Sequence, residues 1–440
     1  MNFSECFKQT GQLCKFSADG KYIANSVQYR VIIRDAKTLQ IASLFTCLDS
    51  IDVLEWSSDS LFILCGNFKR ALVQVWSIEH SDWTCKIDEG VAGLEALRWA
   101  PDGRHILSTS KFKLRITVWS LIDKTVSYIR YPKHTNQGLS FTKDGKFMAL
   151  AERRNCKDFI SIFSCGTWQL VKHFEADTND LTDLAWSPDG RILAVWESCL
   201  EYNMLLYAMN GRIISSYSAY DFALGIKAVT WSPSSQFLVI ASYDQSIRVL
   251  NNITWTAVTE FKHSSSIGDQ NAVIYKEVQM KQVKLPWEAQ AKGPLSSPSQ
   301  YQIQQLPFSV PTVRADPEKA NPKIGVGKVV FSHDNRYIAS RNDNMPTVVW
   351  IWDVKKLSLS TVLVQSQNIQ SMEWDPKETR LAICCGTNKL YMWSPAGCLS
   401  VDVPMEETFN ITGLRWHKDG RELLLLSKNS FCMCSLALAS

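Results

Sequence analysis

Short apolar runs alternate with polar turns along almost the whole chain, and many runs end on a large aromatic residue just before a turn. After Trp186 the turn reads Ser-Pro-Asp-Gly190, in which proline presets φ, aspartate bonds to the backbone and glycine accepts a positive φ. The apolar run Arg191-Ile-Leu-Ala-Val195 follows, and a third run ends on an aromatic residue, as in Val349-Trp-Ile-Trp352. Runs of this length between such turns predict β-strands.

This unit of strand, turn and strand occurs nine times. The anchor aromatic residues are Phe16, Trp56, Trp99, Phe141, Trp186, Trp231, Phe331, Trp374 and Trp416, with spacings of 40, 43, 42, 45, 45, 100, 43 and 42 residues. All spacings but one match the four-stranded blade of a β-propeller. We therefore expect an all-β fold, with residues 1–440 forming a single β-propeller. Nine repeats favour nine blades, and seven or eight regular blades with irregular additions are the alternative.

The two ends of the chain predict how the propeller closes. The first anchor at Phe16 leaves room for one strand before it, whereas the last repeat stops near Ser435 without a fourth strand of its own. We expect the segment from Phe3 to Gln9 to supply that strand and to close the ring. Closure hides sheet edges that would otherwise template aggregation.

The long spacing between the sixth and seventh anchors is an insertion at residues 264–323 that is rich in proline, glutamine and serine. Seven of the fifteen prolines lie in it. Within it, Ala272–Val278 alternates like a strand, whereas 281–321 has the composition of a mobile loop. The insertion is either tolerated without a role or a tethered docking segment, with Trp287 and the stretch from Tyr301 to Phe308 as its anchors.

Composition and charge exclude several classes of protein. The 440 residues carry a net charge of +4, which gives no strong electrostatic reason to expect binding to nucleic acid or to an anionic membrane. No apolar run approaches the length of about 18 residues that a membrane span needs. The first residues have neither a basic nor an apolar signal region, so we expect no secretory leader.

The chain shows no pattern typical of catalysis, a metal or a cofactor. Phosphate-binding, dinucleotide-binding and nucleophile-elbow motifs are missing, no Cys-x-x-Cys pair occurs among thirteen cysteines, and the seven histidines are not spaced as metal ligands. The sequence therefore predicts a protein that is not an enzyme, with no cofactor, no metal and no small-molecule substrate. An enzyme with a site in the propeller channel is the weakest of three hypotheses.

Binding sites are expected where the repeats depart from their own pattern. Most second strands end on small residues, but the fifth repeat has Trp196 and Glu197 there, the fourth has Arg153 and Arg154, and the seventh has Arg341. Tryptophan and arginine are frequent at binding hot spots, so these residues are candidates for partner contacts. In the alternative interpretation, Trp196 fills the channel and the two arginines of the fourth repeat are solvated, with an ion pair to Glu152 or Asp158.

The anchors and the paired aromatic positions resemble the WD-repeat family, and the resemblance covers nearly the whole chain. It is degenerate, because the literal Trp-Asp pair occurs only at Trp352-Asp353 and the Gly-His dipeptide is absent. We therefore expect the Asp-His-Ser/Thr-Trp hydrogen-bond tetrad of regular WD repeats to be mostly missing. Apolar packing between blades must then supply the stability.

Several stretches are similar to one vertebrate family of centrosomal WD-repeat proteins, which is encoded antisense to a p53-family gene. They are Met1–Glu5, Ala151–Arg154, Leu200–Tyr202, Tyr217–Tyr220, Trp231–Phe237, Asn321–Gly325 and Arg341–Asn344. This resemblance implies a scaffold at centrosomes, centriolar satellites and spindle poles in the cytoplasm. It also implies that the Trp-Asp pairs of the family correspond to Trp196-Glu197 and Trp352-Asp353, so Trp352 and Asp353 join the candidate partner-binding residues.

The resemblance further implies a coiled-coil partner, the SSX-interacting protein. With that partner the family acts in anchoring microtubule minus ends, in spindle assembly and in cilium formation, and the microtubule contact is expected to be indirect. The competing hypothesis is a translation factor that binds ribosomal components, because nine-bladed WD-like propellers with degenerate repeats resemble those of some eukaryotic initiation factors.

Overall fold

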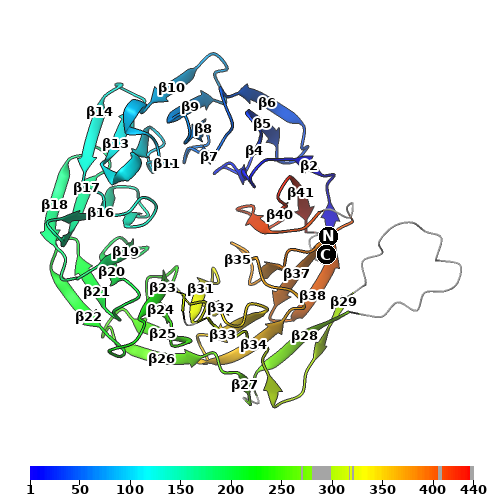
Figure 1. The fold of residues 1–440 in the computed structure, drawn as a ribbon. Coiled ribbons are helices and arrows are strands. Elements are labelled where there is room, and N and C mark those ends of the chain that lie inside the picture. Colours follow the sequence, from blue (N-terminus) through cyan, green and yellow to red (C-terminus); the bar gives the residue numbers. More distant parts are fainter. Residues whose placement is uncertain (269–270, 280–298, 317, 320–321, 405–408, 437–440) are drawn as a thin grey trace, which may run out of the picture. The chain divides into compact units, whose positions relative to one another are not determined.

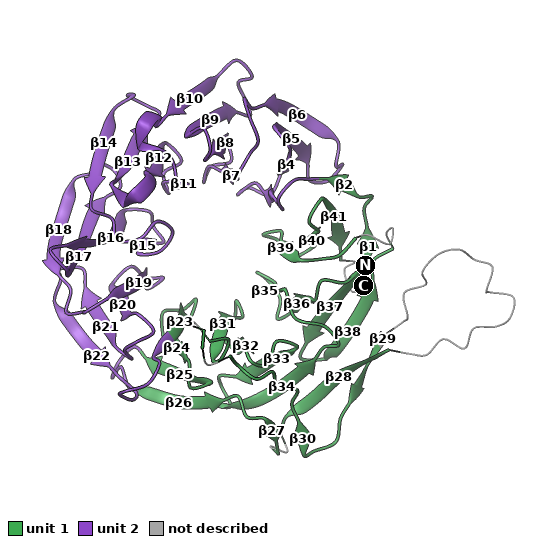
Figure 2. Ribbon diagram, viewed as in Figure 1, with its two compact units in different colours: residues 1–8, 227–251, 257–440 green, residues 9–226, 252–256 purple. Residues whose placement is uncertain are grey.

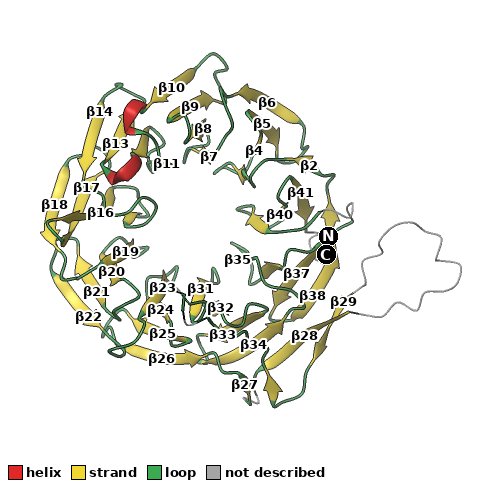
Figure 3. Ribbon diagram, viewed as in Figure 1, coloured by secondary structure: helices red, strands yellow, loops and turns green. Residues whose placement is uncertain are grey.

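The computed structural model describes residues 1–268, 271–279, 299–316, 318–319, 322–404 and 409–436. These residues form β-strands joined by turns and loops, with only two short 3-10 helices, η1 (Gly90–Ala92) and η2 (Lys111–Lys113), drawn red in Figure 3. The predicted all-β fold class is therefore confirmed. Within the described ranges, no helix is both long enough and apolar enough to cross a lipid bilayer.

The chain divides into two compact units, coloured separately in Figure 2. Unit 1 comprises residues 1–8, 227–251 and 257–440, and unit 2 comprises residues 9–226 and 252–256. Unit 2 contains the first five blades, and unit 1 contains the last four together with the N-terminal strands. The expectation of a single domain over 1–440 stays a prediction.

The five blades of unit 2 are four-stranded antiparallel sheets (Figure 1). Their strands are β3 (Cys14–Phe16), β4 (Tyr22–Val27), β5 (Arg30–Asp35) and β6 (Ile41–Thr46); β7 (Val53–Trp56), β8 (Phe62–Asn67), β9 (Leu72–Ser77) and β10 (Thr84–Asp88); β11 (Ala96–Trp99), β12 (His105–Thr109), β13 (Arg115–Ser120) and β14 (Val126–Arg130); β15 (Leu139–Phe141), β16 (Phe147–Arg154), β17 (Lys157–Ser164) and β18 (Leu170–Glu175); and β19 (Leu181–Trp186), β20 (Ile192–Glu197), β21 (Met204–Ala208) and β22 (Ile213–Tyr217).

Unit 1 holds the remaining four blades, two of which carry extra strands. The strands are β23 (Ile226–Trp231), which begins in unit 2, β24 (Phe237–Ser242), β25 (Ser246–Asn251) and β26 (Ala257–Lys262); β31 (Val326–Phe331), β32 (Tyr337–Asn342), β33 (Val348–Asp353) and β34 (Ser358–Val364); β35 (Ser371–Trp374), β36 (Leu381–Cys384), β37 (Lys389–Ser394) and β38 (Gly397–Asp402); and β39 (Gly413–Trp416), β40 (Glu422–Leu426) and β41 (Ser430–Ser435). The described residues thus contain nine blades, and the alternative of seven or eight is wrong.

Every predicted anchor aromatic is the last residue of the first strand of its blade, from Phe16 in β3 to Trp416 in β39. Several of the anchor tryptophans also donate hydrogen bonds to the preceding blade. The indole Nε1 of Trp99 donates to the backbone oxygen of Glu55, which precedes the anchor of the blade before it, and Trp416 bonds Glu373 in the same way. The anchors therefore stabilise both the packing and the hydrogen bonding of neighbouring blades.

The turn after each anchor is held by the side chains that the sequence singled out. In the fourth blade, Thr142 Oγ1 donates to Asp144 Oδ1 over 2.7 Å, and the same carboxylate oxygen accepts the N–H of Lys146. These hydrogen bonds to Asp144, with Thr142 contributing most, lower its pKa. The aspartate therefore closes the turn, as predicted, because its charged form accepts these N–H and O–H groups.

The N-terminal segment completes the last blade, as predicted. Strands β1 (Asn2–Phe3) and β2 (Phe7–Lys8) pair with β41 in antiparallel register, and the rings of Phe7 and Phe431 pack with their centroids 5.4 Å apart. The outer edge of β41 is thus covered by residues more than four hundred positions away in the chain. Covering this edge removes a row of unpaired backbone groups.

The described part of the insertion contains more strand than the sequence indicated. The predicted strand over Ala272–Val278 is confirmed as β28 (Val273–Gln279), which runs parallel to β34. Composition suggested no strand in 281–321, yet β29 (Ser299–Ile303) pairs with β28, and β30 (Phe308–Ser309) pairs with β27 (Ser266–Ile267). For β29, pairing with the edge strand β28 outweighs a polar, proline-rich composition, whereas β27 and β30 form a separate two-stranded sheet. Mobility of the rest of the insertion stays a prediction.

The hydrogen-bond tetrad is reduced but survives in part. In the seventh blade, the indole of Trp352 donates to Ser340 Oγ over 2.9 Å, and His263 Nε2 lies 2.8 Å from the same oxygen. In the third blade, Trp119 Nε1 donates to Ser108 Oγ and to Glu89 Oε1, so a glutamate takes the place of the histidine. Buried hydrogen bonds of this kind add to the apolar packing.

Candidate functional site

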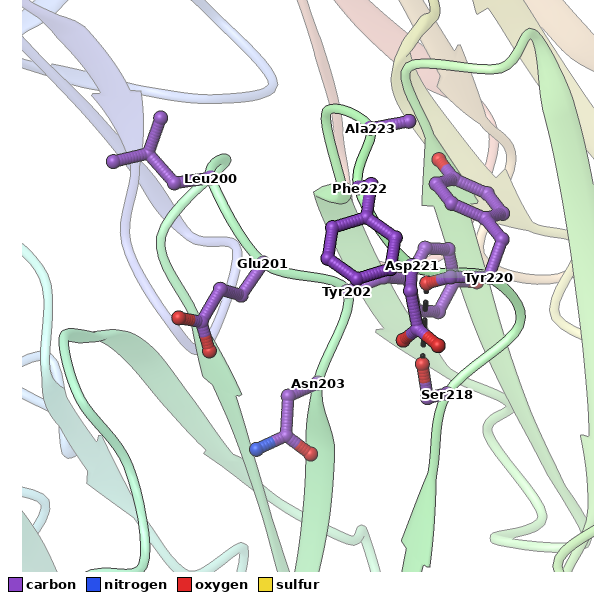
Figure 4. A pocket seen from close by; sticks show the side chains of 9 residues that line it. All are labelled: Leu200, Glu201, Tyr202, Asn203, Ser218, Tyr220, Asp221, Phe222 and Ala223. Carbon is purple, nitrogen blue, oxygen red and sulfur yellow. Dashed lines mark hydrogen bonds between the residues drawn. The ribbon is translucent and has the colours of Figure 1, made fainter.

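Two loops of the fifth blade form the walls of an open cavity of about 480 Å³ in unit 2 (Figure 4). One loop, 198–203, joins β20 to β21, and the other, 218–225, follows β22. Leu200 and Phe222 lie at the rim with their side chains exposed, whereas Tyr202 is buried behind them. The cavity thus combines an apolar rim with a floor of polar and aromatic side chains.

The two loops are held against each other by a close backbone approach. Gly225 N–H donates to the carbonyl oxygen of Cys199 over 2.8 Å. A Cβ atom at Gly225 would lie 2.4 Å from the carbonyl oxygen of Glu201, which is closer than non-bonded atoms can approach. Only glycine lets the two walls meet there, so this residue fixes the width of the cavity.

A second cavity of about 470 Å³ adjoins the first and shares Glu201 and Asn203 with it. Its other walls come from the ends of β17 and β18 in the fourth blade and from Glu197 at the end of β20. We call the two cavities together the acidic groove. Its walls carry six acidic side chains and one lysine: Asp158, Glu175, Asp177, Glu197, Glu201, Asp221 and Lys157.

Glu197 lies in the wall of this groove with only 2% of its surface exposed. Its Oε1 accepts a 2.8 Å hydrogen bond from the N–H of Asn179, and Asn179 Nδ2 donates to the carboxylate of Glu201 over 3.1 Å. Burial and the hydrogen-bonded carboxyl of Glu201 raise the pKa of Glu197 to about 7. The Glu197 carboxyl therefore gains or loses its proton near neutral pH.

Two basic residues of the fourth blade neutralise part of the acidic charge. Lys133, which is almost fully buried, places its Nζ 3.0 Å from Asp158 Oδ2 and 2.7 Å from Asp180 Oδ1. Arg153 places its Nη1 3.0 Å from Asp158 Oδ1, which confirms the ion pair that the sequence suggested as an alternative. Partial burial raises the pKa of Asp180, but Lys133 and Arg153 outweigh it and hold that pKa below its usual range.

The structure brings four of the candidate residues into one region of unit 2. Glu197 lines the groove, and Arg153 forms an ion pair with Asp158 in the groove wall. Arg154 is exposed, and its guanidinium lies 4.5 Å from the ring centroid of Tyr131. Trp196 is buried beside Glu197 in β20. Adjacent residues of a strand point to opposite faces, so Trp196 faces away from the Glu197 carboxylate. A partner contact by Trp196 stays a prediction.

The other candidates of the described chain belong to unit 1. Arg341 donates to the carbonyl oxygen of Ile369 over 3.0 Å. Trp352 is buried, and its ring is stacked on Phe261 with a centroid separation of 4.7 Å. Asp353 is also buried, and its Oδ1 accepts the N–H groups of two following residues in the turn after β33. These contacts support the blade itself, and partner contacts by the three stay predictions.

Several residues of the groove could not be predicted from the sequence, and one predicted residue has no described position. Trp287 lies outside the described residues. Glu201, Asn179 and Phe222 carry no motif, and nothing in the repeat pattern points to them. One signal existed, because Leu200–Tyr202 and Tyr217–Tyr220 resemble the centrosomal family, and residues of both stretches line the cavity.

The side chains of the groove walls define what the groove can bind. Across the described ranges, no three His, Cys, Asp or Glu side chains are grouped so that they could hold a metal ion. The polar groups of its walls are carboxylates, the amides of Asn179 and Asn203, hydroxyls and the ammonium group of Lys157, and no histidine belongs to these walls. What the walls offer is charge, hydrogen-bond acceptors and apolar area.

The repeated four-stranded blades and their anchor aromatics place the chain in the WD-repeat family. The family described as WD domain, G-beta repeat matches residues 168–195 and 211–251, which cover parts of the fourth, fifth and sixth blades. WD-repeat propellers are typically scaffolds without catalysis. The chain belongs to this family because its similarity to a member extends over nearly its full length.

That member is WD repeat-containing protein WRAP73 of Mus musculus, which is 55% identical over 99% of this chain and 96% of its own. An uncharacterized WD repeat-containing protein of Schizosaccharomyces pombe is 25% identical over 90% of this chain and 83% of its own. Among solved structures, a chain of the mitotic checkpoint complex superposes with a TM-score of 0.45 and 11% identity, covering 76% of this chain and 84% of its own.

Proposed function

We propose that this protein is a non-catalytic scaffold or adaptor that captures a partner protein in the acidic groove of unit 2. The observation that carries the proposal is a groove of two adjoining cavities whose rim exposes Leu200 and Phe222 and whose walls carry acidic side chains. Exposed apolar side chains next to a concave polar surface are typical of protein interaction sites. The full-length similarity to a WD-repeat protein supports the same conclusion.

The more specific proposal is a role at centrosomes, centriolar satellites and spindle poles. Its support is the resemblance of several stretches of the sequence to the vertebrate WD repeat-containing protein eight. Two of these stretches contribute residues to the groove. In this proposal, the protein acts with the coiled-coil SSX-interacting protein in microtubule minus-end anchoring, spindle assembly and cilium formation. A net charge of +4 favours indirect contact with the acidic microtubule lattice.

Proximity labelling of the tagged full-length protein in dividing cells, with imaging of the same cells, tests this function. Enrichment at spindle poles together with coiled-coil centrosomal proteins is the expected result. A diffuse cytoplasmic signal with enrichment of ribosomal subunits and initiation factors would contradict it and would support the translation hypothesis instead. Ribosome co-sedimentation in a sucrose gradient provides an independent measurement of that alternative.

A further inference from the structure

We propose that the acidic groove binds a partner segment in which an arginine or lysine stands next to a large apolar residue. The inference rests on the proposed function, because it names the chemistry of the segment that the scaffold captures. Three features of the groove carry it: an exposed apolar rim, carboxylates without a cationic partner, and a common wall that places the two features side by side.

The rim of the groove exposes two large apolar side chains, Leu200 and Phe222, to solvent. Phe222 is fully exposed and adopts a φ of 60°, a region that a bulky side chain rarely occupies. Leu200 is 73% exposed on the facing loop. A partner side chain seated between them would remove apolar area from water, which favours binding. The occupant therefore needs a large apolar side chain.

The charge of the groove determines the second property of the occupant. Asp177, Glu197, Glu201 and Asp221 line it, and no lysine or arginine of the described chain forms an ion pair with any of them. Glu197 is 98% buried, and its Oε1 accepts hydrogen bonds from the N–H of Asn179 and from Asn203 Nδ2 rather than from a cation. A buried carboxyl without a cation is costly, and a cationic side chain of a partner would relieve that cost.

The two features meet at Glu201, which lines both cavities. On its apolar side lie Tyr202 and Tyr220, whose rings pack edge to face with centroids 4.8 Å apart. Aromatic faces attract a guanidinium group, and a carboxylate beside them adds a charged hydrogen bond. A basic residue placed against Glu201 would leave its apolar neighbour at the rim formed by Leu200 and Phe222.

Fluorescence anisotropy with the full-length protein and labelled synthetic peptides measures this preference. The first peptide contains repeated arginine–leucine pairs separated by glycine and serine, the second replaces each arginine by glutamate, and the third replaces each leucine by serine. We expect the first peptide to bind and each of the other two to bind at least about tenfold more weakly. Equal binding of the glutamate peptide would overturn the proposal.

Matched variants separate the groove from the rest of the surface. Glu201→Lys places a positive charge in the common wall and should weaken the arginine–leucine peptide about tenfold or more. Phe222→Ser removes the apolar rim and should weaken it by about three- to tenfold. The controls are Phe112→Ser, at another exposed phenylalanine of unit 2 with a φ of 57°, and Glu95→Lys, at an exposed glutamate outside the groove. Both should bind like the unchanged protein.

Unchanged peptide affinity in both groove variants would contradict the inference, as would an equal loss of peptide affinity in the control variants.

The proposed function fails by a different result, namely the absence of the protein and its coiled-coil partner from spindle poles. If the groove variants still capture the coiled-coil partner at the poles, the scaffold function stands and the groove is not its docking site. If the peptides bind as expected but the poles are not labelled, the inference stands and the proposed location falls.

Discussion

The indole Nε1 of Trp99 donates a hydrogen bond of 3.2 Å to the backbone carbonyl of Glu55, forty-four positions earlier in the chain. Trp56 bonds the carbonyl of Lys15 and Trp374 bonds that of Val330, so the same contact joins other neighbouring blades of each unit. The anchor of Trp186 differs, because its buried Nε1 finds no acceptor in the described chain. Trp99 and Trp186 therefore occupy equivalent positions but should contribute differently to the free energy of unfolding.

Replacing Trp99 by phenylalanine removes the donor and leaves the Glu55 carbonyl without its partner, which should lower the free energy of unfolding by about 1–3 kcal/mol beyond the loss of ring area. Trp186→Phe is the matched control, because it removes a buried donor that has no partner. Urea denaturation of the two variants should show a larger loss for Trp99→Phe. Equal losses would mean that the inter-blade hydrogen bond contributes nothing.

Acid should destabilise unit 1 through His263. Burial lowers the pKa of this imidazole to about 4, despite a contact of 2.8 Å between Nδ1 and the carbonyl oxygen of Gln245. The unfolded chain then binds the proton more tightly than the folded one, so stability is complete above pH 6.5 and falls as the pH drops towards 4, by up to about 1.4 kcal/mol per pH unit.

Urea denaturation at several pH values checks this slope. His263→Asn should flatten the stability profile between these two pH values, whereas His80→Asn, at an exposed histidine of unit 2, should leave it unchanged. A profile that keeps its slope in His263→Asn would assign the acid sensitivity to other groups.

Breaking the buried ion pair of Lys133 and Asp158 should lower the free energy of unfolding far more than breaking a surface ion pair. Their side chains are 6% and 0% exposed, so Asp158→Ala leaves a buried ammonium with only Asp180 beside it and should cost about 3–5 kcal/mol. Glu175→Ala breaks the exposed pair with Lys157 and should cost less than about 1 kcal/mol. Chemical denaturation would contradict the argument if the two costs were similar.

Removal of residues 1–8 should expose the edge of β41 and promote self-association. The segment supplies strands β1 and β2, and Phe7 is buried against Phe431. Size-exclusion chromatography with light scattering should show higher oligomers for the truncated protein and for Phe7→Asp, but not for Phe7→Leu, which keeps the apolar contact. Monomeric behaviour of the truncated protein would show that this edge needs no cover.

Peptide binding in the acidic groove should depend on pH through Glu197. Because its pKa is about 7 in the free protein, a cationic peptide must displace a proton at lower pH, and affinity should rise from about pH 6 to about pH 8. The other charged side chains that line the same cavity are Lys157, Asp158, Glu175, Asp177 and Glu201. Burial is the main cause of this raised pKa and Glu201 adds to it, so anisotropy titrations of Glu201→Gln should show a weaker pH dependence.

The periodic features were predictable because each blade repeats the same local chemistry. The anchor positions, the turn after each anchor and the strand over 272–278 follow from alternation and from turn residues that act within a few positions. Strand β29 could not be predicted in the same way, since a partner strand rather than its own composition supports it. The surviving Trp352–Ser340–His263 contact was also hidden, because its histidine lies 77 positions before the serine.

By itself, the sequence determined the fold class, the nine-fold repeat and the strand from the N-terminus that completes the last blade. It also offered the ion pair between Arg153 and Asp158 as one of two alternatives. These follow from short-range patterns that occur again and again. Only the tertiary structure decided which side chains meet in the groove, because Asn179, Glu197, Glu201 and Phe222 come from three separate segments and obey no repeat. Their arrangement depends on how the loops of two blades pack, and a strand pattern carries no information about that packing.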